Sequence, residues 1–148
     1  MPEQEVDKVL DALVKRLEVI KGIKGVDAFL PDTLAILPRI VLRYLDSPWV
    51  LSSSRNEITH TIQIEAIVAS KSISKRARRE AVGFIRDIKA QLFTVAPGLN
   101  LIAAPNQTTI SPTGSQALRN VVWDDNLYYA GIVIVRCNEV TGETFLAT

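Results

Sequence analysis

Apolar residues recur along this chain in two different periods, and the change from one period to the other predicts its elements. A helical period near the start predicts a helix over residues 3 to 21, which Gly22 ends. A second helical stripe predicts a helix over residues 74 to 93, which Pro97 and Gly98 end. The second stripe consists of Ala77, Ala81, Phe84, Ile85, Ile88 and Leu92.

Three other stretches have the pattern of strands. Residues 40 to 45 are rich in β-branched and aromatic residues. Residues 58 to 68 alternate, so that the even-numbered side chains are expected to face the core. Residues 127 to 137 are apolar at nearly every position, which predicts a strand covered on both faces by helices or by another subunit. Shorter strands are predicted over residues 99 to 102 and 117 to 123.

The segments between these elements are polar or rich in turn residues. Loops are predicted over residues 22 to 38, 47 to 56 and 104 to 115, with a short turn inside the first. Asp124, Asp125 and Asn126 predict a hairpin turn. The order is therefore α-β-β-α-β-β(-β), which indicates an α+β fold with two helices on a mostly antiparallel or mixed sheet of four to five strands.

The bulk composition is typical of one globular domain. The chain has 148 residues, 47% of them hydrophobic, and a net charge of only +1. We expect a single domain over residues 1 to 148, with its core in about residues 6 to 138 and a polar tail over 139 to 148. The acidic start predicts no signal peptide, and the short apolar runs predict no membrane segment.

Few residues in the chain are suited to catalysis or metal binding. His60 and Cys137 are the sole histidine and cysteine, so a histidine-rich metal site or a disulfide within one chain is excluded. Glycine-rich phosphate loops are missing too, and we expect no cofactor and no enzymatic activity. His60 lies on the apolar side of its strand and is interpreted as structural, and Cys137 as a packed residue. An enzyme site completed between subunits around His60 is the alternative, and it requires a solvent-accessible His60.

A basic cluster begins the second predicted helix. Its members are Lys71, Lys75, Arg76, Arg78 and Arg79, with no acidic residue among residues 71 to 79. One interpretation is a solvated helix surface, because Arg76 and Glu80 have the spacing of a surface ion pair. The other is contact with phosphates or with a neighbouring subunit, since arginine at a helix N-terminus is unfavourable for the helix dipole. Aromatic residues do not interleave with the cluster, so stacking on bases is not indicated.

The ordered series of segments resembles the tail terminator, or tail-completion, proteins of long-tailed bacteriophages over about residues 6 to 138. The segments that carry the resemblance are RIVLRYLD, ITHTIQIEAIVAS, SKRARREAVGFIRDIKAQL and NVVWDDNLYYAGIVIVRCN. The resemblance implies a non-enzymatic subunit of a homo-oligomeric ring, expected to be a hexamer. Such a ring caps the tail tube, ends its polymerisation and provides the surface that joins tail to head. DNA would pass through its central channel.

The implied partners are the tail tube protein and a head-completion or connector protein, in the host cytoplasm during assembly and then in the virion at the head–tail junction. Expected contacts lie on the two polar loops and the last strand. The interface candidates are Trp49, Arg55, Asn106, Thr108, Ile110, Tyr128, Ile132 and Ile134. For Trp49, packing at the base of its loop is an equal alternative. Competing functions are a head-completion or neck protein, and a nucleic-acid-binding α+β domain that uses the 71–79 cluster.

Overall fold

The observed fold is α+β, as the sequence pattern predicts. The computed structural model describes residues 2–28, 36–46, 49–51, 56–70, 75–94, 100–102, 108–123 and 126–140. Its elements are α1 (Pro2–Leu17), β1 (Val26–Asp27), β2 (Arg39–Asp46), β3 (Trp49–Leu51), β4 (Asn56–Ser70), α2 (Lys75–Lys89), the π-helical turn η1 (Ala90–Thr94), β5 (Asn100–Ile102), β6 (Thr108–Trp123) and β7 (Asn126–Val140).

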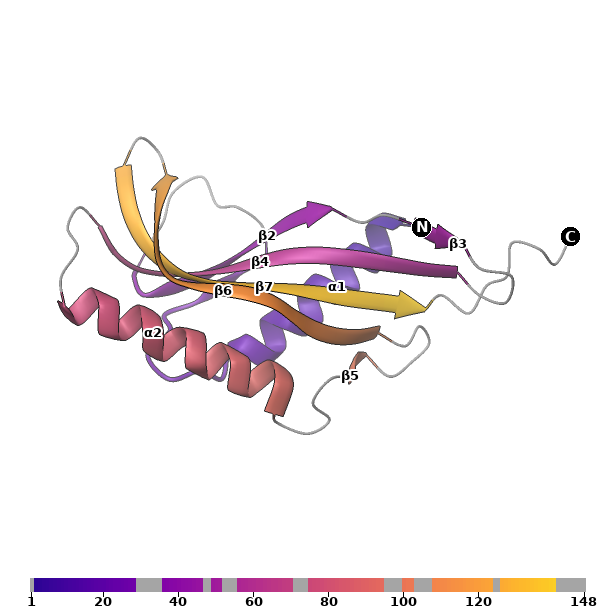
Figure 1. The fold of residues 1–148 in the computed structure, drawn as a ribbon, viewed down its shortest axis with the longest axis horizontal. Helices are drawn as coiled ribbons and strands as arrows, with labels where there is room; N and C mark the ends of the chain where they lie inside the picture. Colours follow the sequence, from indigo (N-terminus) through magenta and orange to yellow (C-terminus); the bar gives the residue numbers. More distant parts are fainter. Residues whose placement is uncertain are drawn as a thin grey trace, which may run out of the picture.

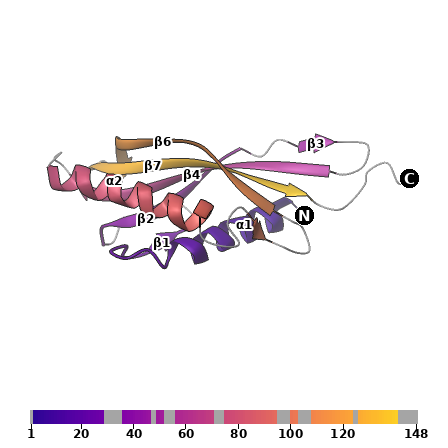
Figure 2. The ribbon, with the colours of Figure 1, turned by 60° about the horizontal axis from the view of Figure 1, so that its bottom comes forward.

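The strands form one mixed sheet with both helices on the same side of it (Figures 1 and 2). In the part of the chain that the structure describes, seven strands pair in the order β1-β2-β4-β7-β6-β5, with β3 on the free end of β4. β1 pairs with β2 in parallel, and the other pairs are antiparallel. The long strands β2, β4, β6 and β7 were predicted, although β6 only in part.

The main core lies between the helices and the even-numbered residues of β4. Ile62, Ile64 and Ala66 on β4 are fully buried, as the alternating pattern predicts. They pack into one cluster with residues from the predicted stripes of both helices, such as Leu13 and Ile88. The buried helical stripes therefore fix how both helices lie on the sheet.

The first helix is shorter than its apolar pattern. It ends at Leu17 rather than near residue 21. The amide of Glu18 still donates to the carbonyl of Val14 at 2.9 Å, but the amide of Ile20 donates to the carbonyl of Leu17 at 3.2 Å, which is a tighter turn. Gly22 then takes a positive φ of 90°, which glycine adopts without a steric penalty.

The predicted loop over residues 104 to 115 is wrong from Thr108 onward, because β6 begins there. Residues 111 to 115 have exposed side chains, and the pairing of β6 with β7 shifts register between Pro112 and Gly114. A bulge of this kind accommodates residues that otherwise interrupt a strand. The pairing with the long strand β7 thus overrides a local composition that is typical of loops.

The sequence pattern did not predict two short strands, β1 and β3. Each has only two or three residues, too few for a recognisable period. β1 is held against β2 by an ion pair between Arg39 and Asp27, and the amide of Ile40 donates to the carbonyl of Gly25 at 3.0 Å. The hydrogen bond from Arg39 to Asp27 raises the pKa of the guanidinium, and partial burial opposes this rise.

The sheet face away from the helices has a small apolar cluster of its own. Val41, Ile67 and Ala130 are fully buried there, with Leu37 and Tyr128 packed against them. β7 is therefore buried on both faces along part of its length, as its composition predicts. On this second face, however, Ala130 is already covered by side chains of the same chain, so its burial does not require another subunit.

The hairpin formed by β6 and β7 extends beyond the rest of the sheet. Pairing of β7 with β4 stops at Tyr128 opposite Ser70, whereas pairing with β6 continues to Asn126 opposite Trp123. In Figure 1 this two-stranded end curves away from α2. Asp124 and Asp125 of the predicted turn, which connect the strands, lie outside the described residues.

Candidate functional site

The outward face of α2 carries a hollow lined by three arginines. α2 buries Ala77, Ala81 and Ile88 against the sheet. Arg78, Arg79, Val82 and Arg86 lie on the opposite face of the helix and are exposed. A surface hollow of about 480 Å³ lies among these outward residues. It is lined by Arg78, Arg79, Val82, Gly83 and Arg86.

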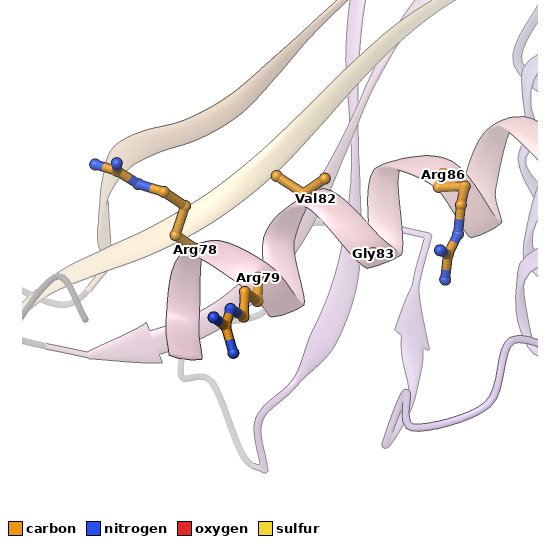
Figure 3. A pocket seen from close by; sticks show the side chains of 5 residues that line it. All are labelled: Arg78, Arg79, Val82, Gly83 and Arg86. Atoms are coloured by element: carbon orange, nitrogen blue, oxygen red, sulfur yellow. The ribbon is translucent and has the colours of Figure 1, made fainter. Parts of the chain in front are cut away.

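The close view in Figure 3 shows how these side chains are arranged. Arg79 and Arg86, seven residues apart, extend to one side of the helix, and Arg78 and Val82 extend to the other. Gly83 lies on the helix backbone between the two sides. Among the residues that line the hollow, none is acidic. The hollow is thus a cationic surface around an apolar side chain.

The arginines of this helix differ in their partners. The predicted surface pair is confirmed, because Nε of Arg76 lies 3.2 Å from Oε1 of Glu80. Arg86 is 3.5 Å from its neighbour Asp87. Arg78 and Arg79 make no ion pair or hydrogen bond with any residue in the described part of the chain. Exposed ion pairs such as Arg76–Glu80 and Arg86–Asp87 contribute little to stability. The arginines of α2 therefore add little to the stability of the fold.

Val82 and Gly83 at the centre of the hollow are unusual for an exposed helix position. Val82 is 50% exposed, although α2 has a complete apolar stripe without it. A Cβ atom placed on Gly83 would meet nothing within 4 Å. Glycine stabilises a helix less than alanine does. Packing inside the chain does not require a glycine at position 83, so we interpret Gly83 as leaving room for another molecule to approach the helix.

The structure places the predicted interface residues in three groups. Thr108, Ile110 and Ile132 are buried within the single chain, and Tyr128 and Ile134 are half-buried. For Trp49 in β3 and Lys75 in α2 only the backbone is described. Arg55, Asn106 and Lys71 lie outside the described residues. Among the candidates whose side chains the structure describes, Arg78 and Arg79 are the two that line the hollow.

His60 lies inside a buried hydrogen-bond network, as a structural histidine would. It is 1% exposed. Its Nε2 atom lies 2.9 Å from Oε2 of Glu139, and its Nδ1 atom lies 2.6 Å from the hydroxyl of Tyr44. With the Nε2 proton donated to the carboxylate, Nδ1 accepts from the tyrosine. The network links β2, β4 and β7. His60 is therefore not accessible to solvent in the single chain, as the alternative of an enzyme site around it would require.

A second buried carboxylate lies on the sheet face away from the helices. Glu65 is 1% exposed, and its Oε1 atom accepts from Nε of Arg43 at 3.1 Å and from Nε2 of Gln63 at 2.7 Å. Its Oε2 atom has no hydrogen-bond partner among the described residues. Arg43, whose side chain is 36% exposed, thus provides the positive charge that compensates this buried carboxylate.

Cys137 is a buried thiol on β7. Burial raises the pKa of the Cys137 thiol to about 12, although the charge of Arg16 opposes this shift. A thiol with such a pKa stays protonated and unreactive at neutral pH. The searched part of the chain contains no group of three metal-ligating side chains. No helix there is long and apolar enough to cross a membrane.

Three residues of the hollow were missed by the sequence interpretation: Val82, Gly83 and Arg86. Two sequence signals could have identified them. Arg86 follows Arg79 by seven residues, which places both on one helix face, and Gly83 interrupts a helix where no turn is needed. Comparison with known proteins gives no match, either to a protein-family model or to a curated sequence.

Proposed function

We propose that the chain is a structural subunit of a long-tailed bacteriophage, a tail terminator that forms a ring on the end of the tail tube. The resemblance over about residues 6 to 138 suggests this role. The observation that carries it in the structure is the outward face of α2, where Arg78 and Arg79, which have no charged partner among the described residues, lie around the exposed Val82. Arginines around an apolar centre are typical of protein interfaces.

The proposed function divides the molecule into a folding part and an assembly part. The core between the helices and β4 holds the fold, whereas the outward face of α2 and the extended end of the β6–β7 hairpin are available to other molecules. In this role the protein ends tube polymerisation by occupying the tube end. It also presents a new surface to the head-completion protein.

The test combines the purified protein with cognate tail tubes, with native mass spectrometry and negative-stain images recorded with and without tubes. We expect a ring on one end of each tube, and tubes that no longer lengthen when tube protein is added. A strict monomer that never associates with tubes would contradict the proposal. Binding to portal-bearing heads alone would favour a neck protein instead.

A further inference from the structure

The hollow on α2 has the chemistry of a docking site for an acidic, partly apolar segment of protein. Three arginines provide positive charge, and the exposed Val82 provides an apolar contact at their centre. The open Gly83 lets a partner's backbone approach the helix closely. A nucleic-acid backbone would use the charges but gain nothing from an exposed valine, so a protein segment fits the hollow better.

The chain itself contains a segment with the complementary chemistry. The extended end of the β6–β7 hairpin carries Trp123 and Leu127 on either side of Asp124 and Asp125. Aspartate suits a turn, but uncharged asparagine or glycine serves there equally well, so the turn alone does not require two adjacent negative charges. The other acidic stretch, at the start of α1, is explained by the helix dipole.

The hairpin end of one chain is not placed to occupy its own hollow. It curves away from α2 in the view of Figure 1. Val122 and Trp123 pair with Leu127 and Asn126 across the hairpin, beyond the last described pair of β7 with β4. A two-stranded end of this kind has little stability by itself and gains order from a partner. The available hollow is therefore that of another copy.

We propose that the hairpin end of one copy, with Asp124 and Asp125, docks into the hollow formed by Arg78, Arg79, Val82, Gly83 and Arg86 of the next copy. The two surfaces differ, so the contact runs head to tail, and repeated contacts of this type close into a ring when the rotation permits. This inference rests on the proposed ring-forming function and names the contact that would build the ring.

Charge reversal on each surface tests the contact. R79E/R86E changes the hollow, D124K/D125K changes the hairpin end, and K21E/K24E reverses exposed lysines elsewhere as the control. Sedimentation velocity over a concentration series measures self-association. We expect each of the first two variants to weaken self-association by about 30-fold or more, and the control to resemble the unmodified chain. Circular dichroism verifies that every variant is folded.

Mixing the variants gives a sharper result than either variant alone. The intact hairpin end of the hollow variant matches the intact hollow of the hairpin variant, and the lysines of the hairpin variant match the glutamates of the hollow variant, so both contacts are complementary in the mixture. The mixture is expected to assemble with the two variants alternating, whereas each variant alone stays monomeric. A chain with both reversals carries complementary surfaces again and is expected to recover self-association.

Three outcomes overturn this inference: an unmodified protein that is monomeric at every concentration, variants that assemble normally, and a mixture in which the two variants do not co-assemble. Loss of duplex DNA binding at low salt in R79E/R86E, with unchanged self-association, would instead assign the hollow to nucleic acid. Failure of the proposed function is distinguishable, because rings that form through this contact but never bind tail tubes contradict the function and leave the contact intact.

Discussion

Two glycines on opposite sides of the interface between α2 and β7 have opposite surroundings. A Cβ atom on Gly131 of β7 would lie 2.9 Å from the carbonyl oxygen of Ala81 and 3.1 Å from the side chain of Ile85. A Cβ atom on Gly83 of α2 would meet nothing within 4 Å. Gly131 is thus required by the fold, because the helix packs directly on the strand. The fold does not require a glycine at position 83, so we infer that Gly83 serves a contact with another molecule.

The two faces of α2 differ in the same way, because one packs on the sheet and the other does not. The largest change in the free energy of unfolding is therefore predicted for a side chain on the inner face. Ile88 is fully buried, whereas Val82 is half exposed. We expect I88A to lower the free energy of unfolding by about 2 to 5 kcal/mol, because it leaves a cavity. V82A should change it by no more than about 0.5 kcal/mol. Urea unfolding measures both, and equal losses would contradict the division into two faces.

A smaller effect is predicted for the glycines themselves. G131A brings a methyl group against the helix backbone, and we expect it to destabilise the protein by about 1 to 3 kcal/mol. G83A should stabilise it by about 0.5 to 1 kcal/mol, since alanine favours a helix and meets no obstacle here. The signs are therefore opposite in the same unfolding experiment. Destabilisation by G83A would show that the fold needs this glycine after all.

The smallest effect concerns the arginines of the hollow. In R78E/R79E, negative charges replace positive ones near the N-terminus of α2, where the helix dipole favours them. We expect the melting temperature to stay constant or to rise slightly, by an amount equivalent to about 0.5 kcal/mol. A clear loss of stability would mean that these arginines serve the fold rather than assembly.

The sequence predicted those parts of the fold in which one residue pattern decides the structure. The stripe through Ala81 and Ile88 and the even-numbered residues of β4 follow directly from periodicity. The strand character of residues 108 to 115 did not, because its cause is pairing with β7, far along the chain. β1 depends on the contact of Asp27 with Arg39, which local sequence does not reveal.

The candidate site was predicted in part. Arg78 and Arg79 were identified from charge alone, and their exposure agrees with a surface role. The hollow was not predicted, because it depends on which side of α2 packs on the sheet and on the open space at Gly83. Several predicted loop and strand contacts, such as Ile110 and Ile132, are buried inside one chain because β6 and β7 pair over their full length.

The central claim is that the outward face of α2 serves assembly rather than folding, and one variant tests it most directly. G83L fills the hollow with a side chain that a helix accepts well and that finds open space at its Cβ atom. Analytical ultracentrifugation over a concentration series compares it with the unmodified chain. We predict a folded, stable protein whose self-association is weakened by about tenfold or more. A folded G83L protein that assembles as tightly as the unmodified chain would contradict the claim.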